Sequence, residues 1–194
     1  MIVNIEIGYV ILYSYLIGSV PYGLILTKLF LNKDLRNIGS GNIGATNAFR
    51  TGKKSLGFLT LILDCLKGYV TILITLNFFP EHILIASLMC FLAHIFPVWL
   101  KFKGGKGIAV YLGILIALSY KLTIIFITTW LVILIIFKYS SLSSLIASLM
   151  VFLFSLWLNN FNQSLFYFVV LIIVIFTHRE NILRLKNKTE NKIK

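Results

Sequence analysis

The sequence predicts an all-α integral membrane protein with about seven transmembrane helices, forming one domain over residues 1–194. Three observations support this prediction: the composition, the apolar runs and the placement of the basic residues. The chain is 59% hydrophobic with a mean hydropathy of +0.94, and only 12% of its residues are charged. In soluble domains roughly 25% of residues are charged, so the composition excludes an ordinary soluble domain.

Apolar runs of suitable length predict the positions of the spans. The first run, near residues 6–30, follows no basic stretch and carries no small-residue cleavage pattern, so we interpret it as a retained span rather than a signal peptide. The other six lie near residues 56–79, 83–100, 108–120, 121–137, 141–158 and 164–177. The run at 108–120 is short and meets the next almost without a loop, so a merged or tilted pair stays open as an alternative.

The basic residues predict the orientation of these spans. If the amino terminus lies outside, 15 of the 18 lysines and arginines fall on the inward side. These residues are Lys33, Arg36, Arg50, Lys53, Lys54, Lys101, Lys103, Lys106, Lys138, Arg179, Arg184, Lys186, Lys188, Lys192 and Lys194. Cytoplasmic segments are enriched in such residues. We therefore expect an outer amino terminus and a cytoplasmic carboxyl terminus.

This topology places four polar segments on the cytoplasmic face, near residues 31–55, 101–107, 138–144 and 178–194. The net charge of +12 predicts anionic ligands, and no nucleic acid partner is expected. The first two segments are rich in glycine, which lets backbone N–H groups approach an oxyanion. KFKGGKG also leads into the start of a predicted helix, an end that attracts anions. Phosphate binding is favoured, and the alternative is that the glycines serve only turns and close helix packing.

Several other kinds of site are disfavoured. The nucleotide motif GxxxxGK[ST] would require glycine in place of Leu100 and a hydroxyl residue in place of Gly107. No histidine pair or cysteine cluster has metal-ligand spacing, so neither a metal site nor a cofactor is expected. His82, beside Glu81, is interpreted as a solvated loop residue. For His94 a structural hydrogen bond and a ligand contact both stay open.

Two charged residues fall inside the second predicted span. Asp64 and Lys67 are three residues apart and therefore lie on one face of a helix. Charges within a membrane are costly unless they are paired or face water. We favour a structural salt bridge between these two residues over a catalytic role.

These segments resemble the motifs of the bacterial acyl-phosphate:glycerol-3-phosphate acyltransferases, the PlsY family, across nearly the whole chain. The matching stretches are GSGNIGATNAFR at 39–50, LDCLKG at 63–68, HIFPVWLKFKGGKG at 94–107, KYSSLSS at 138–144 and HRENILRL at 178–185. The resemblance implies transfer of a fatty acyl group from acyl phosphate to the 1-hydroxyl of sn-glycerol 3-phosphate. The products would be lysophosphatidic acid and phosphate, made in phospholipid synthesis.

The resemblance also implies partners and a location. Besides the two substrates and membrane lipid, it implies functional coupling to the soluble enzyme that produces the acyl phosphate. The protein would lie in the bacterial inner membrane with its active site on the cytoplasmic side. An acyl phosphate has a good leaving group, so the reaction needs positioning and charge stabilisation more than a strong protein base. A substrate phosphate could itself accept the hydroxyl proton.

Residue roles follow from the same resemblance. The implied catalytic residues are Ser40, Arg50, Lys106, His178 and Asn181. The implied substrate-binding residues are Asn42, Asn47, Gly104, Gly105 and Gly107, with Ser141 or Ser144 as a further serine, and Glu190. The stretch before Glu190 reads Lys188-Thr189, whereas Gly-x-Glu is common in the family.

A different class of function stays open, namely a small transporter or channel for an organic phosphate. Glycines and charges at broken helices also serve transporters. Two features disfavour this class: the sequence contains no evident internal inverted repeat, and its polar segments are predicted on one face. A third possibility is a membrane component that binds phospholipid without catalysis.

Overall fold

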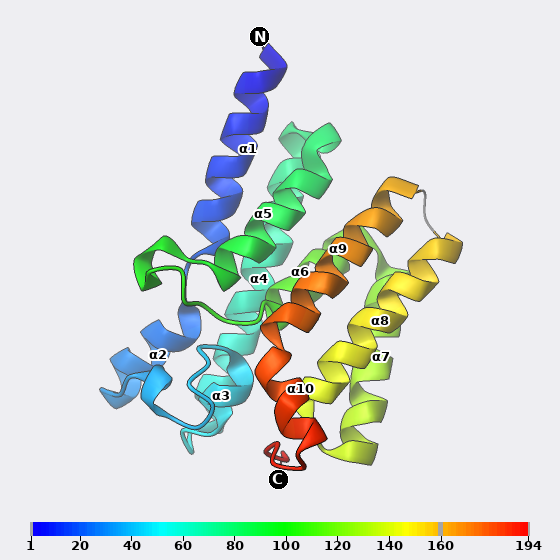
Figure 1. The fold of residues 1–194 in the computed structure, drawn as a ribbon. Helices are drawn as coiled ribbons and strands as arrows, with labels where there is room; N and C mark the ends of the chain where they lie inside the picture. Colours follow the sequence, from blue (N-terminus) through cyan, green and yellow to red (C-terminus); the bar gives the residue numbers. More distant parts are fainter. Residues whose placement is uncertain (1, 159–160, 194) are drawn as a thin grey trace. The chain divides into compact units, whose positions relative to one another are not determined.

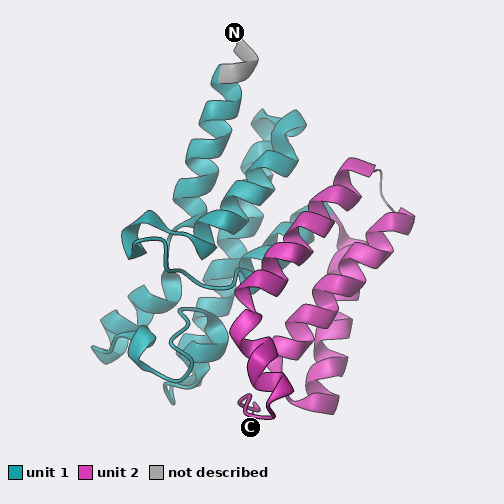
Figure 2. Ribbon diagram, in the orientation of Figure 1, with its two compact units in different colours: residues 1–118 teal, residues 119–194 magenta. Residues whose placement is uncertain are grey.

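The computed structural model describes residues 2–158 and 161–193, and every regular element in them is a helix (Figure 1). Lys194, one of the residues predicted to lie inside, falls outside the described part. The chain divides into two compact units, residues 1–118 and 119–194 (Figure 2). The all-helical class predicted from the sequence is confirmed.

Over its described residues, 2–118, the first unit contains six α-helices and three short 3₁₀-helices. Their order is α1 (Ile2–Gly18), α2 (Tyr22–Leu31), η1 (Leu35–Asn37), α3 (Ala45–Phe49), α4 (Lys54–Phe78), η2 (Pro80–His82), α5 (Ile83–Ile95), η3 (Val98–Leu100) and α6 (Ile108–Leu118). The segments around η1 and η3 are the two glycine-rich regions of the sequence. Long apolar helices therefore carry two polar loops.

The first predicted span is a broken helix. Between α1 and α2 the chain passes through Ser19, Val20 and Pro21, and proline supplies no backbone N–H to continue the helical hydrogen bonds. The Ser19 hydroxyl accepts a hydrogen bond from the Trp99 indole at 2.8 Å, and the Val20 carbonyl accepts one from the Lys67 ammonium at 2.7 Å. Side chains from other helices thus bond to the polar groups exposed by the break.

Small residues let α4 and α6 approach closely. A Cβ at Gly68 would meet the Val110 carbonyl oxygen, and one at Gly113 would meet the Cys65 carbonyl oxygen. Inside a bilayer the hydrophobic effect does not drive helices together, because lipid tails are as apolar as the helix surfaces. Helix association therefore depends on close packing of this kind. α6 starts directly after GGKG, so its packing on α4 anchors one end of that loop.

The second unit contains α7 (Tyr120–Phe137), α8 (Ser140–Leu158), α9 (Phe161–Thr177) and α10 (Arg179–Lys186). α9 and α10 meet at His178 with a bend of 60°. The backbone N–H of Ile193 donates to the Lys138 carbonyl at 2.8 Å, which attaches the tail to the turn between α7 and α8. The two predicted polar segments of this unit, near residues 138–144 and 178–194, are thereby connected.

By helix length and composition alone, the structure has fewer candidate spans than the seven that the sequence predicts. Within residues 2–158 and 161–193, five helical stretches are long and apolar enough to cross a membrane, and a sixth is added if the bent pair α9 and α10 forms one span. α6 has only 11 residues, about 16 Å, whereas the hydrocarbon core is about 30 Å thick. The seven-span count and the orientation of the termini stay predictions. α6 and α7 are separate helices, with Ser119 capping α7.

One interpretation from the sequence is wrong. His82 was expected in a solvated loop, but its side chain is buried. The reason is that α1 covers the connection between α4 and α5: Tyr13 hydrogen-bonds Thr75 near the end of α4 at 2.6 Å and stacks on Phe79. A short loop placed beneath another helix is not solvated, and only the packing of α1 reveals this.

Candidate functional site

The predicted site residues fall into two groups, one in each unit. Ser40, Asn42, Asn47, Arg50 and the GGKG segment belong to the first unit, and the serines, His178, Asn181 and Glu190 belong to the second. Each group has its own local architecture.

The buried Asn47 side chain organises the first polar loop. Its amide nitrogen donates to the carbonyl oxygens of Leu35, Ile38 and Asn42 at 3.0, 2.9 and 2.8 Å, and its oxygen accepts the backbone N–H of Ser40 at 2.9 Å. Because two N–H bonds serve three carbonyls, one of them is shared. The loop from Leu35 to Asn42 therefore wraps around a single amide, which sets the position of Ser40.

Gly39 explains how this loop meets Arg50. Its φ of +53° lies in the left-handed region, which glycine adopts without strain. A Cβ at this position would lie 2.5 Å from the Asn47 amide oxygen and 2.9 Å from the Arg50 Cδ. Gly39, the residue before Ser40, thus lies directly against the Arg50 side chain.

Arg36, a further cation of this loop, forms an ion pair with Asp34. The exposed Arg36 guanidinium lies 2.6 Å from an Asp34 carboxylate oxygen and also donates to it through Nε. Hydrogen bonds from the Arg36 side chain and backbone lower the pKa of Asp34 to about 2, so the carboxylate is charged at neutral pH. Arg36 therefore adds little net positive charge beside Ser40.

The GGKG loop is bonded to the end of α5. The N–H of Gly104 donates to the Ile95 carbonyl at 2.9 Å, and the N–H of Gly105 donates to the His94 carbonyl at 3.0 Å. These two amides are thus engaged and do not cradle a phosphate in this conformation. Close packing, the alternative left open by the sequence, is one role of both glycines, because a Cβ at either position would meet His94. Phosphate contacts through Gly104, Gly105, Lys106 and Gly107 stay predictions.

The His94 ring explains why a side chain is excluded from the loop. A Cβ on Gly105 would collide with its Nε2 atom. On the other side of the ring, Nδ1 lies 2.9 Å from the Lys67 ammonium. An ammonium group only donates, so Nδ1 accepts and the hydrogen of a neutral ring resides on Nε2. His94 therefore makes a structural hydrogen bond to Lys67 and lies against the GGKG loop.

Lys67 is the centre of a buried polar cluster. Its ammonium lies 2.9 Å from the Asp64 carboxylate, 2.7 Å from the Val20 carbonyl and 2.9 Å from His94. The side chains of Asp64 and Lys67 are only 2% and 1% exposed. The predicted ion pair is confirmed. The ammonium is thus paired with one carboxylate and hydrogen-bonded to Val20 and His94, so Lys67 joins α4, α5 and the break between α1 and α2.

In the second unit Glu190 connects the predicted polar residues. One carboxylate oxygen accepts from the Ser141 hydroxyl at 2.7 Å and from the Asn181 amide at 2.6 Å. The other accepts from the Arg184 guanidinium at 2.8 Å. Burial raises the pKa of Glu190, but the hydrogen bonds from Arg184, Asn181 and Ser141 outweigh it, so the pKa lies below its ordinary value. Glu190 is a charged structural link at neutral pH.

His178 is buried at the bend between α9 and α10. Its Nδ1 atom lies 2.8 Å from the Val174 carbonyl oxygen. A carbonyl oxygen only accepts, so Nδ1 carries the hydrogen and Nε2 is the basic nitrogen of the neutral ring. The geometry thus selects one tautomer of a predicted catalytic residue.

The two candidate serines have different surroundings. Ser141 donates to Glu190, whereas the Ser144 hydroxyl donates to the Ser140 carbonyl at 2.9 Å and accepts from the Trp130 indole at 3.1 Å. Ser144 therefore joins α7 to α8. Of the two alternatives, Ser141 is the one attached to Asn181 through a common carboxylate.

Sequence reasoning gave no role to Arg184 or to the link between Lys67 and His94. Arg184 lies three residues after Asn181, so both face one side of α10. That spacing, with an acid nearby in the tail, is a signal that could have found the Glu190 cluster. Lys67 bonds to His94 and Val20, which lie 27 and 47 positions away, and no local sequence pattern indicates either bond.

The Glu190 cluster gives a pH-dependent prediction. Since the folded pKa lies below its ordinary value of 4.5, the carboxylate contributes stability above that value and loses it as the pH falls through the folded pKa. At pH 7 we expect the Glu190→Gln variant to exchange the amide hydrogens of residues 187–193 roughly tenfold faster than the wild type, because charge-assisted hydrogen bonds contribute about 1.5–3 kcal/mol.

Hydrogen exchange followed by mass spectrometry, comparing both proteins at each pH, checks this. The difference between them should shrink as the pH falls below 4.5. An unchanged difference at low pH would show that the charge of Glu190 does not hold the tail.

Comparisons with known proteins bear on the whole chain. A model of the family described as glycerol-3-phosphate acyltransferase matches residues 8–188. A protein of that name from Pelagibacter ubique is 55% identical over 185 residues, which cover 95% of this chain and 96% of that protein. Another from Rhodopseudomonas palustris is 47% identical over 194 residues, covering 100% of this chain and 98% of that protein.

Two crystal structures of PlsY (YgiH), an integral membrane glycerol 3-phosphate acyltransferase, are similar to this structure. Its glycerol 3-phosphate form has a TM-score of 0.92 and 36% identity, covering 97% of this chain and 96% of that chain. Its lysophosphatidic acid form has a TM-score of 0.89 and 34% identity with the same coverage.

Proposed function

The chain belongs to the glycerol-3-phosphate acyltransferase family, and we propose that it transfers a fatty acyl group from an acyl phosphate to the 1-hydroxyl of sn-glycerol 3-phosphate. It is a multi-pass membrane acyltransferase. The observation that carries the proposal is the match of nearly the whole chain, in sequence and in fold, to enzymes of this name. The proposed products are lysophosphatidic acid and inorganic phosphate.

The reaction forms one ester bond and breaks one mixed-anhydride bond. The glycerol oxygen attacks the acyl carbonyl carbon, the bond from that carbon to the phosphate oxygen breaks, and the hydroxyl proton passes to the phosphate. Since phosphate is a good leaving group, the protein's contribution is to hold two anions together and to stabilise charge on the acyl oxygen. Cations and polar side chains are suited to this task, and no cofactor is needed.

The first unit offers two cations for these anions. Arg50 lies against the segment that carries Ser40, in a loop held by Asn47. Lys106 follows two glycines that are pinned to α5. We propose that both side chains neutralise substrate phosphates, with Ser40 as a hydrogen-bonding contact. Asn42 accepts the N–H of Gly44 at 2.8 Å, which supports a shaping role in the same loop.

The second unit offers His178 and Asn181. We propose that Asn181 contacts a substrate, oriented by its 2.6 Å hydrogen bond to Glu190, and that His178 contacts one through Nε2. Glu190 is a positioning residue, because a direct contact between its carboxylate and a phosphate would be repulsive. Its charge is balanced by Arg184, and Ser141 shares the same carboxylate.

We further propose that the protein lies in the bacterial inner membrane with the reaction on its cytoplasmic side. The excess of basic residues in the segments that carry the site supports this orientation. An acyl phosphate produced by a soluble enzyme would reach the site from the same side, so functional coupling to that enzyme is part of the proposal.

The decisive experiment compares acyl donors with purified protein in lipid. We expect long-chain acyl phosphate to support acylation of glycerol 3-phosphate, while acyl-CoA and acyl carrier protein do not, because only the acyl phosphate presents an anhydride whose leaving group is phosphate. The measurement is radiolabelled lysophosphatidic acid formed over time.

A protein carrying both Ser40→Ala and Arg50→Ala is the control for contaminating activity. Equal rates with acyl-CoA would refute the proposed donor. Uptake of glycerol 3-phosphate into sealed vesicles without product formation would favour a transporter instead.

A further inference from the structure

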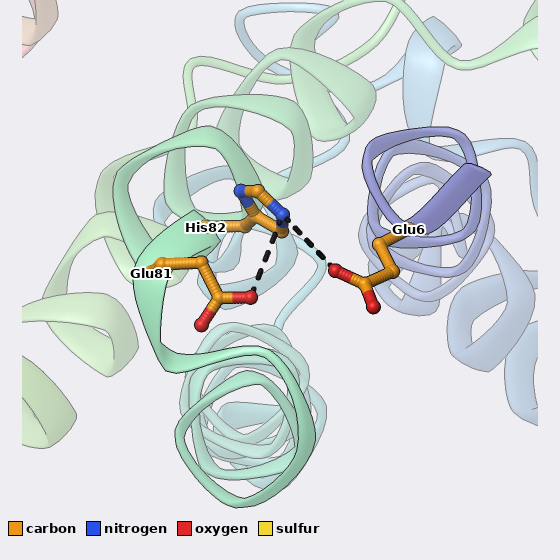
Figure 3. Close-up of side chains that lie close together, drawn as sticks. All are labelled: Glu6, Glu81 and His82. Carbon is orange, nitrogen blue, oxygen red and sulfur yellow. Dashed lines mark ion pairs between the residues drawn. The ribbon is translucent and has the colours of Figure 1, made fainter. Parts of the chain in front are cut away.

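Glu6, Glu81 and His82 form a cluster that the acyltransferase function does not use (Figure 3). Glu6 belongs to α1, whereas Glu81 and His82 belong to η2 in the connection between α4 and α5. This connection lies at the opposite end of the 25-residue helix α4 from the first polar loop, a separation of about 37 Å along the helix. The cluster is therefore remote from the candidate site of its own unit.

The His82 imidazole faces both carboxylates without bonding to either. Its Nε2 atom lies 3.6 Å from a Glu81 oxygen and 3.9 Å from a Glu6 oxygen, beyond hydrogen-bond distance. The side chain is only 9% exposed, and within residues 2–158 and 161–193 Nε2 has no hydrogen-bond partner. A buried polar atom without a partner is costly. A ligand held between the three groups would remove that cost.

The spacing of these atoms suits a shared metal ion. Zinc binds imidazole nitrogen and carboxylate oxygen at about 2.0–2.2 Å in tetrahedral geometry, so two atoms bound to one ion lie about 3.3–3.6 Å apart. The distance of 3.6 Å lies at the upper end of this range and that of 3.9 Å exceeds it slightly, and all three ligand atoms lie within 4.8 Å of one another. Small rotations of the two glutamates would complete the coordination.

The chemistry of the ligands selects the class of ion. An imidazole nitrogen with two carboxylates suits zinc and similar transition metals, whereas Mg²⁺ and Ca²⁺ prefer oxygen alone. The two carboxylates balance the charge of a divalent ion. Both are partly exposed, so an ion can enter from water and a water molecule can fill the fourth position.

The backbone around the cluster is already in place. Tyr13, seven residues after Glu6, hydrogen-bonds Thr75 and stacks on Phe79, and the His82 N–H donates to the Phe79 carbonyl at 2.9 Å. α1 and the α4–α5 connection are therefore held next to each other by other contacts. The sequence did not indicate a metal site because Glu6 and His82 are 76 positions apart, far outside local ligand spacing.

We propose that Glu6, Glu81 and His82 bind a divalent transition-metal ion of the zinc class, which ties α1 to the connection between α4 and α5. The ion is structural and takes no part in acyl transfer. The site would add a cross-link at the end of the unit that lacks the polar loops.

The test measures Zn²⁺ binding to purified, tag-free protein in detergent after treatment with a chelator. We expect one saturable Zn²⁺ per chain by calorimetry and by elemental analysis. Glu6→Gln and His82→Asn should each weaken binding at least tenfold, since loss even of a group supporting a ligand costs about 10–100-fold in affinity. Excess Mg²⁺ should not compete. Zn²⁺ should also raise the unfolding temperature of the wild type but not of the variants.

Glu180→Gln is the matched control, because Glu180 is an exposed acid of α10 in the second unit, and its Zn²⁺ binding should equal that of the wild type. Glu6→Gln changes a partly exposed side chain and keeps its shape, so it tests the site even if His82→Asn folds poorly. Binding unchanged in Glu6→Gln, or no stoichiometric Zn²⁺ in the wild type, would overturn the proposal. Either result would leave His82 as an ion-pair partner of the two glutamates only.

Discussion

Replacing Lys106 with alanine is expected to slow acyl transfer by about 30-fold to 1000-fold. If the ammonium neutralises a substrate phosphate in a partly dehydrated site, its removal costs roughly 2–4 kcal/mol of transition-state stabilisation. The loop supports this role because the N–H groups of Gly104 and Gly105 are bonded to α5. With those amides engaged, the lysine side chain is the group of the GGKG segment to which we assign the phosphate contact.

Lys103→Ala is the matched control for Lys106→Ala. Lys103 belongs to the same loop and is exposed, so its loss removes the same charge from the surface without changing the site. We expect a change in rate of less than about twofold there, because exposed charges interact weakly across water. Initial rates at limiting and saturating glycerol 3-phosphate, after equal membrane insertion is confirmed, separate binding from turnover.

Near-normal turnover of Lys106→Ala would refute this role of the lysine even though the chain is an acyltransferase. Gly105→Val would be a poor substitute for this test. A side chain at that position meets the His94 ring, so the loop would move whether or not a phosphate binds nearby.

Replacing Lys67 with methionine is expected to lower the free energy of unfolding by about 3–5 kcal/mol, because it leaves the Asp64 carboxylate buried without its cation. Methionine keeps most of the volume of the lysine stem but makes neither the ion pair with Asp64 nor the hydrogen bonds to Val20 and His94. Unfolding in mixed micelles of increasing denaturing detergent, followed by circular dichroism, measures the loss.

The second variant of this experiment carries both Lys67→Met and Asp64→Asn. Removing both charges should recover at least half of the lost stability, since the unpaired carboxylate is the main cost. Lys28→Met, at an exposed position of α2, should stay within about 0.5 kcal/mol of the wild type. If the double variant is no more stable than Lys67→Met, the ion pair is not the source of the effect.

From the sequence alone follow the all-helical membrane class of the protein, its long apolar segments and its family. These properties depend on local information: the length of an apolar run, or a motif of adjacent residues such as GGKG. The Asp64 and Lys67 pair was also within reach, because residues three apart on a helix lie on one face. Asn47 and Ser40 likewise belong to one short motif, residues 39–50.

Only the tertiary structure decided which polar groups meet. His82 is buried because α1 covers the α4–α5 connection, and Lys67 bonds to Val20 because α1 breaks beside α4. Glu190 joins Asn181 and Ser141, which lie 9 and 49 positions away. In a membrane chain most side chains are apolar and interchangeable in pattern, so the sequence does not say which helix faces which. Partners of buried polar atoms follow from that packing, because each such atom must find a hydrogen bond or an ion wherever its helix is placed.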